Sequence, residues 1–294
     1  MEDVVTDSEG RTLLVGGHGW VGRALQEAAE ARGCATMATG SHDSIATDRD
    51  LASAVEDFSP TSLIFLAGVT PDRGPQLGKG GYQRSLDRIY TELDAVLSMY
   101  EFDHITYLSS GIAGRPPSQV HSPFREMYRQ AKVAEEALVD SHALSRTVLT
   151  MRIFSLSGPF ARDPLRYALF DFIRQARTGL ITVSANGLVW RSYVSVLDVA
   201  RVILGSAEMG ISGVRSTGGK SIELAELARR VAQVVNPAAS VVSAERRSGV
   251  DSYVGDDLEW RKWCTEVGVT GAGLSEQISE SARWLDQAVP ARHP

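Results

Sequence analysis

The sequence predicts an α/β fold: a doubly wound parallel sheet with a smaller C-terminal part. Two observations support this prediction. Short apolar runs rich in β-branched residues alternate with longer runs that carry one apolar helical face. The first short run leads into a glycine-rich turn at residues 16–22, which in turn leads into a helix-like run. A strand, a glycine turn and a helix in this order form the setting of a dinucleotide-binding turn.

The composition is that of an ordinary soluble globular protein. The chain has 294 residues, of which 43% are hydrophobic and 22% charged, and its formal net charge of -6 argues against nucleic-acid binding. The N-terminus lacks the apolar core of a signal peptide, and no apolar run approaches the ~20 residues that cross a bilayer. The two cysteines, Cys34 and Cys264, are too few for a disulfide framework. We therefore expect a cytoplasmic protein without a membrane segment.

The first predicted strand runs from Thr12 to Val15, an apolar stretch bounded by glycine. The helix that follows ends near Gly33. Its apolar residues recur at helical spacing, namely Val21, Ala24, Leu25, Ala28 and Ala29.

The glycines between these elements follow a GxxGxxG spacing. Gly16 allows a sharp turn, Gly19 allows the backbone to approach a pyrophosphate, and Gly22 allows the helix to pack tightly on the strand. The helix N-terminus offers N–H groups and a partial positive charge to phosphates. A purely structural tight turn remains the alternative explanation of this motif.

Later strands are predicted at residues 34–39 and 63–69, which we expect to be the second and fourth, and at residues 104–108. The last of these runs into Ser109, Ser110 and Gly111. A serine hydroxyl at the carboxyl end of a parallel strand lies where α/β sheets bind ligands, and it can hydrogen-bond a carbinol oxygen there. An ordinary Ser/Gly turn is the alternative.

Tyr128 and Lys132 are four residues apart in a run with helical spacing, so they share one helix face. An ammonium group near a phenol stabilises the phenolate and lowers its pKa from ~10 towards neutrality. A tyrosine with such a pKa can exchange a proton with a carbinol oxygen at neutral pH. A solvated helix face is the alternative for this pair taken alone.

Taken together and in this order, the glycine turn, the serine strand and the tyrosine–lysine helix resemble the extended branch of the short-chain dehydrogenase/reductase superfamily. The resemblance covers roughly residues 11–285. It implies a Rossmann fold in which Tyr128 is the acid/base, Lys132 lowers its pKa and holds the nicotinamide ribose, and a serine orients the substrate oxygen. Alignment on the strand makes that serine Ser110, which we favour, whereas alignment on Gly114 makes it Ser109.

The resemblance also implies the residues that bind a nicotinamide cofactor. Asp48 matches the residue that touches the adenine, although it is equally well explained as a helix cap. No acidic residue stands at the end of the second strand, in Thr39 to His42, and Arg23 lies near enough to reach a 2′-phosphate, so NADP is favoured over NAD. The implied cofactor-binding residues are Gly16, Gly19, Trp20, Val21, Gly22, Arg23, Asp48, Leu66, Ala67, Gly68, Tyr128 and Lys132.

The implied substrate is a nucleotide-linked sugar. Arg191 matches the arginine that grips its diphosphate; a structural pairing with Asp198 or another carboxylate is the alternative. Arg247 matches a second diphosphate arginine, or belongs to a solvated arginine pair. Asp198 is expected to cap the helix that follows it. The implied substrate-binding residues are Ser109, Ser110, Gly111, Arg191 and Arg247.

The branch's dehydratases carry an Asp-Glu pair after the catalytic residue, and this chain has Gly111-Ile112 there. We therefore expect an oxidoreductase, most specifically a 4-ketosugar reductase. A 4-epimerase that retains NAD is one alternative, and a non-catalytic NADP(H) sensor or scaffold is another. We expect a dinucleotide-binding domain at residues 1–155 and a substrate-binding part at 156–294, with 188–205 returning to the sheet. We expect no metal site and leave a homodimer open.

Overall fold

The computed structural model of the chain describes residues 10–40, 55–120, 122–185, 187–243 and 249–288. The chain forms two compact units that are discontinuous along the sequence, whereas we expected a division after residue 155 with only residues 188–205 returning to the sheet. The first unit comprises Met1–Leu108, Arg115–Thr150 and Ala207–Gly213, and the second comprises Ser109–Gly114, Met151–Ser206 and Val214–Pro294.

The central element is a six-stranded sheet with the strand order β2-β1-β3-β4-β5-β9. Its register is parallel where β1 pairs with β2 and β3, and where β3 pairs with β4. The strands are β1 (Thr12–Val15), β2 (Thr36–Thr39), β3 (Ser62–Phe65), β4 (His104–Ser110), β5 (Thr147–Ile153) and β9 (Gly213–Ser216). The predicted α/β class with a parallel sheet is confirmed.

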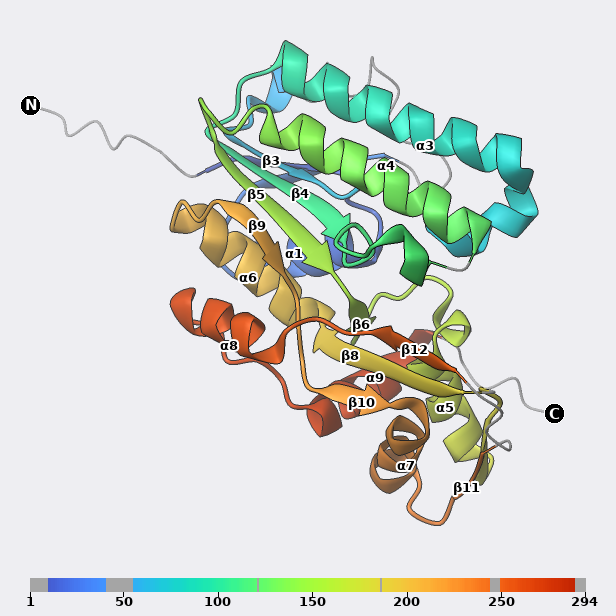
Figure 1. Cartoon of the computed structure of the whole chain (residues 1–294). Coiled ribbons are helices and arrows are strands. Elements are labelled where there is room, and N and C mark those ends of the chain that lie inside the picture. The colour runs from blue at the N-terminus through green and yellow to red at the C-terminus, as the bar shows by residue number, and fades with distance from the viewer. Residues whose placement is uncertain (1–9, 41–54, 121, 186, 244–248, 289–294) are drawn as a thin grey trace, which may run out of the picture. The chain divides into compact units, whose positions relative to one another are not determined.

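Three helices of the first unit are α1 (Trp20–Glu30), α3 (Gly74–Met99) and α4 (Pro123–Asp140), and α3 and α4 lie side by side along the sheet (Figure 1). The apolar faces of α3 and α4 pack on β1, β3 and β4, of which β4 is buried at every residue. The core between them includes Leu63, Phe65, Ile89, Leu93, Leu97, Ile105 and Tyr107. This packing fixes α4, which carries Tyr128 and Lys132, against β4.

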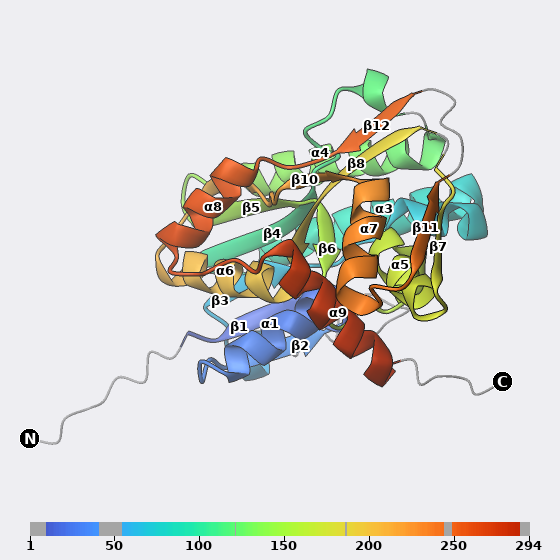
Figure 2. The ribbon, with the colours of Figure 1, turned by 90° about the horizontal axis from the view of Figure 1, so that it is seen from below.

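The second unit contains a smaller sheet in which β8 (Leu188–Ser195) pairs with β10 (Ser221–Glu223), β12 (Val250–Tyr253) and β6 (Ser155–Ser157), and a separate pair of β7 (Leu180–Val183) with β11 (Ser240–Ser243). Its helices α5 (Ala168–Arg177), α7 (Leu224–Val235) and α9 (Leu274–Ala288) pack on one another (Figure 2). Two further helices are α6 (Val196–Glu208) and α8 (Asp257–Glu266), and short 3-10 turns lie at Pro71–Arg73 and Pro117–Gln119 in the first unit and at Pro164–Arg166 in the second.

The segment at about 188–205, which we expected to return to the main sheet, forms β8 and α6. β8 lies in the smaller sheet, and the last strand of the main sheet is β9. An alternating apolar pattern identifies a strand but does not say which sheet it joins. Among the described residues, no helix is long and apolar enough to cross a membrane.

Candidate active site

The glycine turn between β1 and α1 packs tightly on its own backbone. Gly16 has a φ of +82°, and a Cβ placed there would lie 2.8 Å from the backbone nitrogen of Ala67. A Cβ at Gly22 would lie 2.2 Å from the carbonyl oxygen of Gly17. Both positions therefore need glycine for reasons internal to the chain, and Gly16 brings the turn against the Leu66–Gly68 segment.

Gly19 differs from these two glycines. A Cβ there would approach no heavy atom more closely than 3.3 Å, the distance to the carbonyl oxygen of Gly16. Gly19 is the N-cap of α1, so the first turn of the helix and the positive end of the helix dipole lie beside it. The position nearest the expected pyrophosphate is therefore the least crowded of the three glycines.

The end of β2 lies next to this turn. The Gly16 N–H donates a hydrogen bond of 3.0 Å to the carbonyl oxygen of Thr39. The Thr39 hydroxyl is buried and has no hydrogen-bond partner among the described residues. A buried hydroxyl without a partner fits a site that a ligand completes. Asp48 lies outside the described residues.

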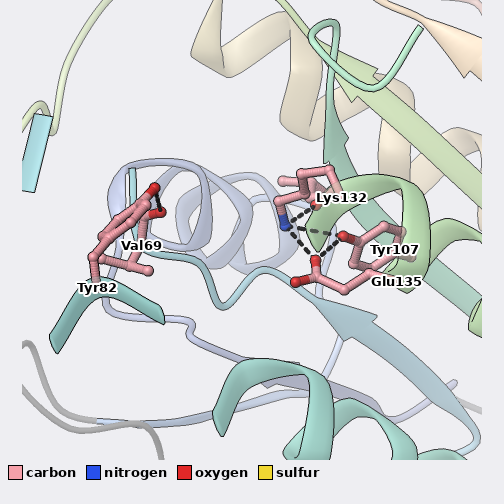
Figure 3. Close-up of polar contacts among 6 residues, drawn as sticks. Val69, Tyr82, Tyr107, Lys132 and Glu135 are labelled. Carbon is pink, nitrogen blue, oxygen red and sulfur yellow. Dashed lines mark hydrogen bonds and ion pairs between the residues drawn. The ribbon is translucent and has the colours of Figure 1, made fainter. Parts of the chain in front are cut away.

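Lys132 is buried in an ion pair (Figure 3). Its Nζ donates to Glu135 Oε2 at 2.8 Å, to the Tyr107 hydroxyl at 2.9 Å and to the Leu108 carbonyl at 3.5 Å. The Lys132 and Glu135 side chains are 4% and 1% exposed. A lysine ammonium has three N–H donors, so each of them has an acceptor within the protein.

The Tyr107 hydroxyl completes this cluster by donating to Glu135 Oε2. Burial and the neighbouring carboxylate raise the pKa of Tyr107 well above its ordinary value, so its phenol stays protonated. Because its proton points to Glu135, its oxygen is free to accept from Lys132. Glu135, which also belongs to the first unit, thus balances the positive charge of Lys132.

Tyr128 lies close to this cluster, as its one-turn spacing from Lys132 predicted. The Lys132 Nζ is 5.7 Å from the centroid of the Tyr128 ring, and a Cβ at Gly68 would lie 3.9 Å from the same Nζ. The structure therefore brings the tyrosine–lysine helix to the Leu66–Gly68 segment, which itself contacts Gly16. Sequence reasoning missed Glu135, although a glutamate three residues after Lys132 on one helix was a visible signal.

Ser110 ends β4 in the second unit and is 8% exposed. Its Oγ is 2.9 Å from the hydroxyl of Tyr253 on β12, a residue that sequence reasoning missed. A separation of 143 residues leaves no local signal for such a contact. Ser109 is 5% exposed, and a Cβ at Gly111 would lie 2.4 Å from the ring of Phe154. Gly111 is therefore required by the aromatic side chain beside it.

Arg191 on β8 has an acidic partner in this structure. Its guanidinium donates to Asp251 Oδ2 at 2.7 Å, to the Asp251 carbonyl at 3.2 Å and to the Trp190 carbonyl at 2.8 Å. The carboxylate is that of Asp251 on β12 and not that of Asp198. Arg247 lies outside the described residues.

Asp198 has a structural role that differs from the expected helix cap. It lies in the first turn of α6, and its Oδ2 accepts a hydrogen bond of 2.7 Å from the Ala272 N–H. Asp198 therefore ties α6 to the loop ahead of α9. Burial raises the pKa of its carboxyl. Within the described ranges, no group of histidine, cysteine and acidic side chains could hold a metal ion.

A protein-family comparison identifies the chain's relatives. The model of the NAD dependent epimerase/dehydratase family matches residues 12–216, which is most of the chain. The chain belongs to this family. The resemblance drawn from its motifs is confirmed, and so is its place among NAD-dependent enzymes. None of the curated proteins compared with the chain matches it.

Several solved structures share the fold of this chain at low sequence identity. The GDP-mannoheptose C4 reductase of Campylobacter jejuni with NADP bound has a TM-score of 0.76 at 15% identity, over 95% of this chain and 98% of that one. The UDP-N-acetylglucosamine 4-epimerase of Bacillus cereus has a TM-score of 0.70 at 17% identity, over 97% and 99%. The UDP-glucose 4-epimerase of Thermus thermophilus with NAD has a TM-score of 0.69 at 20% identity, over 95% and 100%.

Proposed function

We propose that this chain is a nicotinamide-dependent reductase that converts the keto carbon of a nucleotide-linked sugar, at position 4, into a hydroxyl group. The contact of Gly111 with Phe154 argues against a dehydratase. A dehydratase would need an acidic side chain at position 111, where even a Cβ would lie 2.4 Å from the Phe154 ring. The proton-abstracting pair of a dehydratase has no room here.

Similarity to the C4 reductase of Campylobacter jejuni supports this proposal, since that enzyme is solved with NADP. The similarity to 4-epimerases supports a second candidate, a 4-epimerase that retains NAD. Both reactions use the same acid/base chemistry, so they differ in whether the cofactor is released. That the protein is cytoplasmic and that it can form a homodimer remain predictions from the sequence.

In the proposed reaction, the Tyr128 phenol gives its proton to the substrate oxygen during reduction, and the Ser110 hydroxyl hydrogen-bonds the same oxygen. The nicotinamide cofactor, when bound, supplies the hydride. The positive charge of Lys132 stabilises the phenolate form of Tyr128. The Glu135 carboxylate weakens this stabilisation, because it lies 2.8 Å from the same ammonium group. The expected grip of Lys132 on the ribose requires it to give up one of its protein acceptors.

Two features of the first unit fit a dinucleotide. Gly19 leaves the N-terminus of α1 accessible to a pyrophosphate, and the partnerless hydroxyl of Thr39 lies at the end of β2, where the adenosine ribose would bind. Thr39 is neutral, so it does not repel a 2′-phosphate. Arg23 is exposed on the first turn of α1, which supports the preference for NADP.

The reaction is tested with UDP-, dTDP- and GDP-linked 4-ketosugars and NADPH, following NADPH absorbance. We expect one nucleotide class to be reduced, and Tyr128→Phe to lower turnover by ~10²–10⁴ with cofactor affinity nearly unchanged. Turnover of Tyr128→Phe near that of wild type contradicts the acid/base assignment. Protein purified with tightly held NAD that interconverts 4-epimers indicates the epimerase instead.

Cofactor preference is tested by measuring the dissociation constants of NADPH and NADH by fluorescence. NADPH should bind at least as tightly as NADH, because no acidic residue among the described residues guards the end of β2. A tenfold preference for NADH overturns this expectation and points to Asp43, which lies outside the described residues.

The role of Arg191 is tested by calorimetric titration of UDP, dTDP and GDP. A diphosphate must compete with Asp251 for the guanidinium. Arg191→Ala should therefore weaken nucleotide binding by roughly 2–4 kcal/mol, as expected for a desolvated charge pair that loses one member. Asp251→Asn, the matched control, should strengthen it. Weaker binding in Asp251→Asn, or no binding by the wild type, makes Arg191 a structural residue.

A further inference from the structure

The hydroxyl groups of Ser110 and Tyr253 form a short hydrogen-bonded chain within the second unit. The Ser110 Oγ is 2.9 Å from the Tyr253 hydroxyl, which is 3.1 Å from the carbonyl oxygen of Ile153. The Tyr253 ring packs on Phe154 with their centroids 4.8 Å apart. The ring of Tyr253 is thus fixed by Phe154, and its hydroxyl group lies within hydrogen-bond distance of both Ser110 and Ile153.

The positions of the protons in this chain follow from what each group can donate. A carbonyl oxygen only accepts, so the single proton of Tyr253 points to Ile153. The Tyr253 oxygen must then accept the proton of Ser110. The Ile112 N–H lies 3.4 Å from the Ser110 Oγ and also donates to it. In this state the proton of Ser110 is directed at Tyr253 and away from a substrate.

The direction of these hydrogen bonds can reverse without moving a heavy atom. The Ile153 carbonyl oxygen also accepts the N–H of Gly111 at 2.9 Å, so it keeps a donor when Tyr253 turns its proton away. Hydroxyl protons rotate freely between partners. After the reversal, Tyr253 donates to Ser110, and the proton of Ser110 is available to a substrate oxygen.

We propose that Tyr253 is a positioning residue that acts through Ser110: by donating to the serine hydroxyl, it frees the serine proton for the substrate oxygen and strengthens that bond. This proposal rests on the role of Ser110 in the proposed function. Consecutive hydrogen bonds polarise one another, so a phenol behind the serine makes it a better donor. The gain is largest when negative charge develops on the substrate oxygen.

Tyr253→Phe tests this proposal, because it removes the hydroxyl and keeps the ring that packs on Phe154. With the 4-ketosugar that is reduced fastest and NADPH, kcat should fall about three- to tenfold, the effect of one net hydrogen bond, with KM nearly unchanged. Ser110→Ala should lower kcat by ~10²–10³. The double variant Ser110→Ala/Tyr253→Phe should be no slower than Ser110→Ala, since Tyr253 is proposed to act through Ser110.

Tyr193→Phe, which removes a buried phenol elsewhere in the second unit, is the matched control and should keep wild-type kcat. A second measurement places 3-fluorotyrosine at position 253: its more acidic phenol is a stronger donor, so kcat should rise. Equal slowing by Tyr253→Phe in the Ser110→Ala background overturns the proposal, as does an effect on KM alone or an unchanged kcat. Wild-type turnover by Ser110→Ala instead contradicts the role given to Ser110 in the proposed function.

Discussion

Lys132 and Glu135 illustrate how single residues constrain this site. Both charges are almost fully buried, and burying an isolated charge is costly. The cost is offset by their ion pair and by the Tyr107 hydroxyl, which bonds to both. Either charge left alone would lack its counterion in a place that water does not reach.

We therefore predict that Lys132→Met lowers the free energy of unfolding by about 3–5 kcal/mol, as for other broken buried pairs. Lys132→Met/Glu135→Gln should lose much less, because no unpaired charge remains. Urea denaturation followed by circular dichroism measures both changes. Arg129→Met, which breaks the more exposed pair with Glu126 on the same helix, is the control and should cost no more than ~1 kcal/mol. A double variant as unstable as Lys132→Met contradicts this account.

Among the elements, the turn into α1 separates two uses of glycine. Gly22 lacks a side chain because the chain packs on itself, with 2.2 Å between a Cβ and the Gly17 carbonyl. Gly19 faces less crowding, at 3.3 Å, and has an ordinary negative φ of -75°. The two glycines belong to one motif, but Gly22 is needed for packing within the protein, whereas Gly19 is needed for the close approach of the ligand.

Gly22→Ala should therefore destabilise the fold by about 1–3 kcal/mol, the usual cost of overpacking, and lower the melting temperature. Gly19→Ala should melt near wild type but bind NADPH at least ~10-fold more weakly, a loss of about 1.4 kcal/mol. Thermal unfolding and fluorescence titration of the two variants measure these effects. Normal NADPH affinity in Gly19→Ala would mean that the pyrophosphate does not approach this glycine.

Strand β4 buries all of its residues, including His104, whose Nε2 lies 3.0 Å from the Thr106 hydroxyl. Burial lowers the pKa of His104 to about 4. Below its unfolded pKa of ~6.5, the unfolded chain takes up a proton that the folded chain refuses. The neutral histidine therefore stabilises the fold fully above that pH, and this stability is lost as the pH falls towards 4.

We predict that the free energy of unfolding falls between pH 6.5 and pH 4 with a contribution of up to ~1.4 kcal/mol per pH unit from this histidine. His104→Gln should remove that contribution and flatten the curve. Urea denaturation of both proteins at several pH values across the window gives the slopes. Equal slopes would show that His104 is protonated in the folded protein.

Local patterns in the sequence were enough to predict several elements and the proximity of two candidate site residues. Thr12–Val15 is a strand with the predicted bounds, and the one-turn spacing of Tyr128 and Lys132 placed them together. The contacts of Tyr253 with Ser110 and of Asp251 with Arg191 join residues 143 and 60 positions apart. Such contacts depend on how β12 pairs with β8, and strand pairing has no signature in either segment alone.

At the scale of the whole molecule, the boundary between the two units falls within strands. The chain passes from the first unit to the second inside β4 and inside β5, and again inside β9. Each of these three strands contributes residues to both units. Neither unit can therefore lose its part of these strands without disturbing the other.

We predict that calorimetry shows one cooperative transition, with the calorimetric enthalpy equal to the van't Hoff enthalpy. NADPH at about 100 times its dissociation constant should stabilise the protein by about 2.7 kcal/mol and move the entire transition to higher temperature. Two transitions, of which NADPH moves only one, would show that the units unfold separately.

The discontinuous units also determine how this chain can be recombined with its relatives. A chimera that joins residues 1–155 of this protein to the rest of another would remove residues 207–213 from their own unit. It would also break the 2.8 Å ion pair of Arg32 with Glu208, which lies in that returning segment. Exchange of substrate specificity by a single crossover should therefore yield unstable hybrids. Crossovers at every boundary between the units, including those on both sides of residues 109–114 and of residues 207–213, would keep each unit whole.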